Sequence, residues 1–204
     1  MTTFAVIPAA GKSSRMGRPK LTLPFRGKTV LECVIGALRD AGIQHVLVVI
    51  GSHAPQLVPV AESAGALVLR LEGETADMRA SVEQGLRWLE GRFQPKDEDA
   101  WLLAPADHPA LDADVIRQLI VARTMNPEQS IIVPTYKGKR GHPALIGWKH
   151  VSKISGLPAG TGIDWYLRET GVFELPLESE SIVIDLDSPA DYERLRRDAS
   201  TRSL

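Results

Sequence analysis

A run of small, hydroxyl-bearing and basic residues follows the first apolar stretch of the chain, in VIPAAGKSSRMGRPK at residues 6–20. Small residues let a backbone approach a ligand closely, and consecutive backbone N–H groups in such a turn bind phosphate oxygens. The small residues here are Ala9, Ala10 and Gly11. The Ser13 hydroxyl follows, and the cations Arg15 and Lys20 could neutralise a triphosphate while its α-phosphorus is attacked. The stretch therefore indicates a site for a nucleoside triphosphate.

Two other phosphate-binding motifs fit this stretch less well. The tripeptide G-K-S at residues 11–13 matches the end of a P-loop, but that pattern needs a glycine at position 6, where the chain has Val6. The apolar segment that ends at Asp107 could still be a Walker B strand, with Asp107 as its acid. The dinucleotide pattern G-x-G-x-x-G also fails, because Gly11 and Gly17 are too far apart. The spacing therefore favours a different phosphate-binding loop.

Apolar runs alternate with amphipathic segments along the chain, which is typical of an α/β fold whose mainly parallel sheet is covered on both faces. The expected strands cover residues 4–8, 45–51, 66–70, 100–107, 130–136, 142–147, 172–176 and 181–187. The expected helices cover 29–42, 54–65 with a break at Pro59, 77–92, 112–125 with Asp112 as N-cap, and a last helix with Ser188 as N-cap, Pro189 at N1 and Asp191 at N3. The strands on either side of residues 137–139 predict a late antiparallel hairpin. With no linker or repeat, we expect one domain over residues 1–204.

The composition narrows the class of protein. The chain is 44% hydrophobic and 24% charged with a formal net charge of −1, so no overall field attracts nucleic acid or an anionic membrane. The single cysteine, Cys33, excludes an internal disulfide framework. No apolar run approaches the roughly 20 residues of a membrane span. We expect a cytoplasmic protein without a nucleic-acid or membrane partner.

Ligands of parallel sheets bind beyond the carboxyl ends of the strands. This rule points to the loop after residues 4–8, to Asp107, and to the chain that follows residues 181–185. Asp185 and Asp187 alternate, so on an extended strand they would point to the same side. Each of these acids could instead cap local amides or complement a helix dipole.

The stretch AAGKSSRMGRPK resembles the signature A-A-G-x-S-x-R-M-G-x-x-K of the MobA-like NTP transferases. Later segments are also similar to segments of that family, namely ASVEQGL, LLAPADHPAL, RGHPALI and IDLDSPADY. The resemblance implies a Rossmann-like, GT-A-like nucleotidyltransferase with three α/β/α layers. It also implies Mg²⁺-dependent transfer of a nucleoside monophosphate from an NTP to a phosphorylated acceptor, with release of pyrophosphate.

The resemblance assigns roles to the charged residues. Arg15 and Lys20 would be catalytic and would hold the triphosphate. Asp107 would be catalytic as a Mg²⁺ ligand, and Asp187 would be the second metal ligand, with Asp185 as the alternate.

Each of the other candidate residues could have either a functional or a purely structural role. Ser81 would either bond the nucleotide or cap its helix. His142, in the RGHP segment, would lie on the acceptor side. His108 is expected to be a turn residue, and Arg79 and Lys139 are expected to be surface cations that could also steer an anionic acceptor.

The sequence says less about the identity of the substrates than about the type of reaction. The Ala10-Gly11 pair, in place of two glycines, favours the cytidylyl branch, so the expected reaction is CMP transfer from CTP to molybdopterin cofactor. The segments around Asp77-Met78 and AGTGIDWYLRE depart from the family pattern and leave the acceptor open. A sugar- or polyol-phosphate acceptor is the alternative. A non-catalytic protein that binds nucleotide, or that delivers molybdenum cofactor to a molybdoenzyme partner, is the rival function.

Overall fold

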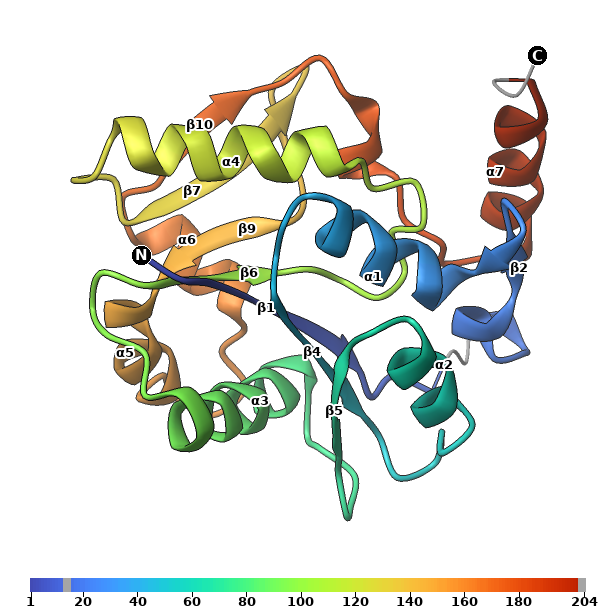
Figure 1. The fold of residues 1–204 in the computed structure, drawn as a ribbon, viewed down its shortest axis with the longest axis horizontal. Helices are drawn as coiled ribbons and strands as arrows, with labels where there is room; N and C mark the ends of the chain where they lie inside the picture. Colours follow the sequence, from blue (N-terminus) through green and yellow to red (C-terminus); the bar gives the residue numbers. More distant parts are fainter. Residues whose placement is uncertain (13–15, 202–204) are drawn as a thin grey trace.

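The computed structural model describes residues 1–12 and 16–201. Its centre is a twisted sheet with the order β10-β7-β9-β6-β1-β4-β5, and β8 pairs with β7 (Figure 1). The strands of this sheet are β1 Thr3–Ala9, β4 His45–Ile50, β5 Leu67–Arg70, β6 Ala100–Leu103, β7 Ile131–Tyr136, β8 Lys139–Arg140, β9 Ala144–Gly147 and β10 Phe173–Pro176. A separate two-stranded ribbon joins β2 Pro24–Phe25 to β3 Lys28–Thr29.

Helices cover both faces of the sheet. They are α1 Val30–Asp40, α2 Leu57–Ser63, α3 Met78–Phe93, α4 Ala113–Met125, α5 Val151–Ser155 and α6 Ile163–Glu169. A further helix, α7 Pro189–Thr201, lies beside β2, where Tyr192 Oη donates to Pro24 O at 2.6 Å (Figure 1). Short 3-10 turns lie at η2 Lys20–Thr22, η3 Trp148–His150 and η4 Glu180–Val183. Figure 1 shows α1 and α4 along one side of the sheet and α3 and α5 along the other. None of the helices within the described ranges has the length and hydropathy needed to cross a bilayer.

Successive side chains of each buried strand point to opposite faces of the sheet, so the hydrophobic core has two parts, one on each face. In β1, Ala5 and Ile7 pack with the core of α1, α2 and α4, whereas Phe4 and Val6 pack with the core of α3, α5 and α6. All four side chains are essentially inaccessible to solvent. This two-sided burial explains why the strands are continuous apolar runs, and it confirms the predicted three-layer α/β/α fold.

The strand directions agree with the prediction. β1 is parallel to β4 and β6, β4 is parallel to β5, and β7 is parallel to β10. β9 is antiparallel to both of its neighbours, β7 and β6. The expected late hairpin is confirmed, with the small strand β8 added after its turn.

Helix starts are also placed as predicted. The Asp112 side chain accepts a 2.9 Å hydrogen bond from the backbone N–H of Asp114 at the start of α4. At the start of α7, the Ser188 hydroxyl donates to Asp191 Oδ2 at 2.6 Å and accepts from the Asp191 backbone N–H at 3.3 Å. The predicted break at Pro59 is wrong, because α2 begins at Leu57 and Pro59 lies in its first turn. A backbone N–H is not needed for the helix at that position.

The prediction of a strand over residues 181–187 is wrong. Residues 180–183 form η4, and the chain then crosses the carboxyl ends of the strands without joining the sheet. Its backbone hydrogen bonds go to two different loops: Ile182 O accepts from His142 N at 2.8 Å, and Leu186 N donates to Asp107 O at 2.9 Å. Ile182 and Leu186 are fully buried, so the alternating apolar pattern reflects burial over the core and not strand pairing.

Candidate active site

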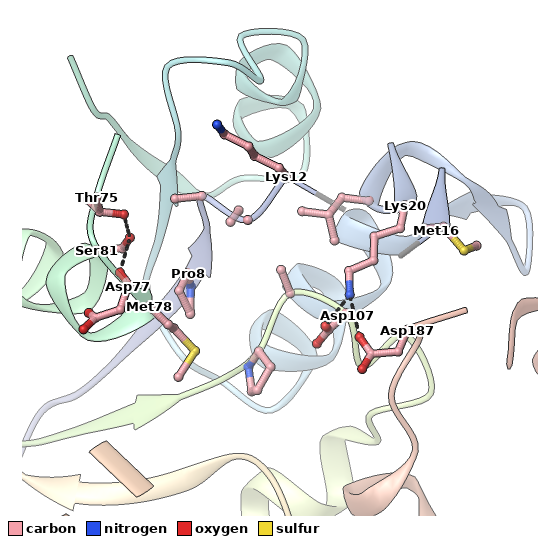
Figure 2. A pocket seen from close by; sticks show the side chains of 16 residues that line it. Pro8, Lys12, Met16, Lys20, Thr75, Asp77, Met78, Ser81, Asp107 and Asp187 are labelled. Carbon is pink, nitrogen blue, oxygen red and sulfur yellow. Dashed lines mark hydrogen bonds and ion pairs between the residues drawn. The ribbon is translucent and has the colours of Figure 1, made fainter. Parts of the chain in front are cut away.

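A cavity of about 410 Å³ lies beyond the carboxyl end of β1, between the loop that follows this strand, the start of α3 and the loop after β6. Figure 2 shows its lining. The lining residues are Pro8, Ala9, Ala10, Gly11, Lys12, Met16, Lys20, Leu21, Thr75, Asp77, Met78, Ser81, Pro105, Ala106, Asp107 and Asp187. The structure therefore brings into one cavity seven residues expected from the sequence: Ala9, Ala10, Gly11, Lys20, Ser81, Asp107 and Asp187. Ser13 and Arg15 lie outside the described residues.

The ammonium group of Lys20 joins the two proposed metal ligands. Lys20 Nζ donates to Asp107 Oδ2 at 2.7 Å, to Asp187 Oδ1 at 3.1 Å and to the carbonyl oxygen of Leu186 at 2.9 Å. These three bonds use all three N–H donors of a lysine. Burial alone would lower the pKa of Lys20, but the hydrogen bonds and negative charges of Asp107 and Asp187 outweigh it and raise the pKa above its ordinary value. The group is therefore held firmly as a cation.

Local structure places these three side chains. Pro19 precedes η2, which begins at Lys20. Asp107 lies in the turn after β6, and the bond from Leu186 N to Asp107 O fixes the 184–188 segment to that turn. The capped start of α7 follows directly after Asp187. Three segments that are remote in sequence thereby converge on one point.

The structure places Asp187, and not Asp185, in the wall of the cavity. Asp187 lines the cavity and bonds Lys20, whereas Asp185 does not line it. Burial raises the pKa of Asp185, and the negative charges of Asp187 and Asp107 raise it further. The geometry therefore favours Asp187 as the partner of Asp107.

The pair Asp107 and Asp187 fits a divalent cation that also binds phosphate. Their carboxylates converge on a single positive centre, which here is the Lys20 ammonium. Among the described residues, no cluster of three or more His, Cys, Asp or Glu side chains could hold a metal ion without further ligands. Two carboxylates completed by substrate phosphates and water are the usual environment of Mg²⁺ in nucleotide enzymes.

The loop after β1 borders the cavity with backbone and small side chains. Ala9 is buried, and Gly11 has open space where a side chain would begin, since a Cβ there would meet no described atom within 4 Å. Two contacts connect the loop to other segments. His53 Nε2 lies 3.4 Å from Gly11 O, and Lys12 Nζ forms an ion pair with Glu74 Oε1 at 2.7 Å. Ala9, Ala10 and Gly11 therefore line the cavity, and phosphate binding by their backbone N–H groups stays a prediction.

Ser81 lies in the cavity wall and does not cap its helix. Asp77 is the N-cap of α3, since its Oδ1 accepts from Ala80 N at 2.8 Å. Ser81 is one turn further along, 1% exposed, and its hydroxyl is 2.7 Å from that of Thr75. Sequence reasoning missed Thr75 because the residue lies in an irregular loop where no periodic pattern marks it.

His142 lies outside the cavity lining and packs against His108. Their ring centroids are 5.4 Å apart, the planes are nearly perpendicular, and both Nδ1 atoms are buried without a hydrogen-bond partner in the described part of the chain. Burial, then the neighbouring His142, lowers the pKa of His108 to about 4. Burial also lowers the pKa of His142. His108 is therefore a buried, neutral residue beside Asp107, in the turn segment that follows β6.

Arg79 has a structural role that the sequence did not indicate. Its Nη1 donates to the carbonyl oxygens of Leu157 at 3.1 Å and Pro158 at 3.0 Å, and its Nε lies 3.2 Å from Glu83 Oε1. The side chain is only 12% exposed, so the expectation of a surface cation is wrong. Lys139, on β8, is exposed as expected.

Comparison with known proteins places the chain in a family. The family model of the MobA-like NTP transferase domain matches residues 5–172. The molybdenum cofactor cytidylyltransferase of Escherichia coli K12 is 24% identical over 189 residues, which is 92% of each chain. Rv0371c of Mycobacterium tuberculosis, in a crystal structure with manganese, is 26% identical with a TM-score of 0.75, over 97% of this chain and 99% of that one. A nucleotidyl transferase from Methanothermobacter has the same fold, with 24% identity and a TM-score of 0.79 over 98% and 99% of the two chains. The chain therefore belongs to the MobA-like NTP transferase family and is a nucleotidyltransferase.

Proposed function

We propose that this enzyme transfers CMP from CTP to the phosphate of molybdopterin cofactor and releases pyrophosphate, with Mg²⁺ as its metal ion. The observation that carries the proposal is the convergence of Lys20, Asp107 and Asp187 at one end of a cavity bordered by a small-residue loop. A cation beside two carboxylates and exposed backbone N–H groups is the arrangement that a metal-bound triphosphate requires.

Each residue has a defined task in this reaction. The backbone of the loop after β1 binds phosphate oxygens, and Lys20 exchanges its bonds with the carboxylates for bonds to the triphosphate. Asp107 and Asp187 would hold the metal ion, which would supply positive charge to neutralise the triphosphate. Arg15 provides a second cation for the triphosphate, and Ser13 a hydroxyl donor. Because the acceptor phosphate is already an anion, positioning and charge neutralisation supply the rate without a strong general base.

The choice of substrates has separate support. The E. coli relative is named as a molybdenum cofactor cytidylyltransferase, and the Ala10-Gly11 pair also favours the cytidylyl branch. The Rv0371c structure with manganese supports a divalent ion. His142 does not line the nucleotide cavity and packs against His108, the residue next to Asp107, which suits a role toward the acceptor. A molybdoenzyme would receive the product.

The test is a pyrophosphate-release assay that combines each of ATP, GTP, CTP and UTP with Mg²⁺ and with molybdopterin or a sugar 1-phosphate. We expect release with CTP, Mg²⁺ and molybdopterin, and none when the metal is chelated. Release with another nucleotide or with the sugar phosphate would reassign the substrate within the same reaction class. Tight nucleotide binding without release in any combination would favour the delivery protein.

A further inference from the structure

A second cavity, of about 390 Å³, lies apart from the nucleotide cavity and shares none of its lining residues. One side of α1, the loop between β6 and α4, and the start of η4 form its walls, and the ribbon of β2 and β3 contributes Arg26 and Lys28. Figure 1 shows α1 beside the loop that leads into α4. The volume is in the usual range for a small-molecule site. We call this space the ribbon cavity.

The two cations of the ribbon line this cavity without an acid partner. Lys28 lies over α1, since a Cβ on Gly36 would be 3.7 Å from Lys28 Nζ. The Arg26 guanidinium lies over the Phe25 ring, 5.1 Å from its centroid. Neither cation forms an ion pair with a residue in the described part of the chain. Their charges are therefore available to an anion.

Ser179 and Ser181 add a hydroxyl donor to the ribbon cavity. Their Oγ atoms are 2.8 Å apart, and Ser181 is 7% exposed. Each hydroxyl has one proton, and the bond between the two uses only one of them, whichever residue donates. Neither hydroxyl bonds any other described residue. One proton of the pair is therefore always left for a ligand.

Cys33 indicates that both cations act inside the cavity. The residue belongs to the α1 wall, and its Sγ donates to Phe25 O at 3.4 Å. Burial raises the pKa of the Cys33 thiol, whereas the positive charges of Lys28 and Arg26 act to lower it. The two charges therefore reach the wall opposite the ribbon.

The acids of the ribbon cavity do not neutralise these cations. Asp112 Oδ1 accepts from Asp114 N as the cap of α4, and Asp40 is exposed to solvent, which screens its charge. Pro109 and Leu111 are buried and form an apolar part of the wall. The cavity therefore offers two cations and a hydroxyl donor beside a small apolar surface.

We propose that the ribbon cavity is a second anion site, which binds the phosphate group of a small molecule. Arg26 and Lys28 neutralise its charge, and the hydroxyl pair donates a hydrogen bond to a phosphate oxygen. The same three segments build this cavity and the active site: the ribbon follows Lys20, residues 109–113 follow Asp107, and η4 precedes Asp187. A bound phosphate would therefore contact each segment that carries a charge of the active site. This site does not depend on CTP and molybdopterin being the substrates.

Cys33 is the single cysteine of the chain, so its alkylation reports on this cavity alone. The test measures the rate at which iodoacetamide, a neutral reagent, alkylates the full chain at fixed pH, in inorganic phosphate or in chloride of the same ionic strength. We expect phosphate to slow the reaction, because a bound anion shields the thiol and disfavours its thiolate. At about ten times the Kd, the rate should fall roughly tenfold.

Arg26→Gln and Lys28→Gln should each raise the phosphate concentration that gives half-maximal protection. The increase should be roughly tenfold, since each change removes a charge-assisted hydrogen bond. Each variant is compared with itself in chloride, which corrects for a changed reactivity of Cys33. Lys153→Gln, at an exposed cation of α5, is the matched control and should leave the protection unchanged.

Ribose 5-phosphate distinguishes the two sources of the phosphate group. Half-maximal protection at a lower concentration than with inorganic phosphate would assign the site to a phosphate ester whose organic part contacts Pro109 and Leu111. Protection at an equal or higher concentration would assign it to the free ion.

Protection in phosphate that is no greater than in chloride would overturn the site. Protection that is lost in Lys20→Met and kept in Arg26→Gln would also overturn it, since the phosphate would then lie in the nucleotide cavity. Both results leave the proposed function intact, because pyrophosphate release tests that function separately.

Discussion

Lys20 Nζ lies 2.7 Å from Asp107 Oδ2, although the two residues are 87 positions apart in the sequence. The same ammonium bonds Asp187, so in the ligand-free chain a lysine neutralises the two carboxylates proposed to bind metal. Lys20 and a metal ion bound by these carboxylates would therefore compete for the same oxygens. This relationship leads to the first prediction.

Replacing Lys20 by methionine should strengthen metal binding in the absence of nucleotide. Removal of the ammonium leaves Asp107 and Asp187 without this counter-cation, so we expect the affinity for Mn²⁺ alone to rise roughly tenfold, or about 1.4 kcal/mol. The catalytic efficiency with NTP should fall, because Lys20 no longer reaches the triphosphate. Electron paramagnetic resonance of free Mn²⁺ measures the first effect. Lys28→Met, at an exposed cation on β3, is the control, and unchanged Mn²⁺ affinity in Lys20→Met would contradict the competition.

Replacing Asp107 by asparagine should abolish turnover and leave the fold intact. Asparagine has nearly the same shape but lacks the charge that would hold the metal ion, so we expect a loss of roughly 10²–10³-fold or more in kcat. Because Asp107 is partly exposed and Lys20 keeps its bonds to Asp187 and Leu186, the free energy of unfolding should change by less than about 1 kcal/mol. Pyrophosphate release and urea denaturation measure the two quantities. Asp97→Asn in an exposed loop is the control, and activity within tenfold of wild type would remove Asp107 from the metal site.

Replacing Ser188 by alanine should weaken both α7 and the metal site. The Ser188 hydroxyl bonds Asp191, and the residue directly follows Asp187. Loss of this cap should lower the free energy of unfolding by about 1 kcal/mol. It should also raise, several-fold, the Mg²⁺ concentration that gives half-maximal activity, because Asp187 is less well positioned.

Asp112→Ala, which removes the cap of α4, provides the comparison for Ser188→Ala. We expect a similar loss of stability from it, with no change in the Mg²⁺ requirement. An equal effect of both variants on the Mg²⁺ requirement would mean that general destabilisation, and not the position of Asp187, is responsible.

Stability should fall as the pH is lowered from 6.5 toward 4, in part through His150. This residue is 4% exposed, with its Nδ1 2.7 Å from Tyr166 Oη and its Nε2 2.8 Å from Ser130 Oγ. Burial, and then the positive charges of Lys149, Lys153 and Arg123, lower its pKa to about 4. The unfolded chain binds a proton near pH 6.5 and the folded chain does not, so the stabilisation is complete above pH 6.5 and is lost as the pH falls to 4. The loss is at most roughly 3 kcal/mol.

The pH effect is measured by urea denaturation at pH 7.5 and pH 4.5. His150→Gln should be less stable than the wild-type protein at pH 7.5. The difference in the free energy of unfolding should narrow at pH 4.5, because only the wild-type protein loses stability through protonation of His150 in the unfolded chain. His53→Gln, at an exposed histidine, should show no such narrowing. A constant difference between His150→Gln and wild type at both pH values would assign the pH dependence to other groups.

The amino-acid sequence by itself determined the features that depend on near neighbours along the chain. Continuous apolar runs predicted the buried strands, because each face of β1 must be covered. Short-range capping placed the starts of α4 and α7 at Asp112 and Ser188. The loop with Lys20 was recognisable because small and basic residues at fixed spacing meet the requirements of phosphate binding.

Only the tertiary structure decided how remote segments meet. The alternation of Asp185 and Asp187 does not by itself separate the two acids. The family resemblance favoured Asp187 and kept Asp185 as the alternate, and the residues matched by the family model end before both. The bond between Leu186 and Asp107, with burial of Ile182 and Leu186 over the core, turns the segment across the strand ends and brings Asp187 to Lys20. Thr75 likewise reaches the cavity wall only through the fold, where its hydroxyl lies 2.7 Å from that of Ser81. Such contacts depend on packing between elements far apart in the chain, and no local pattern encodes them.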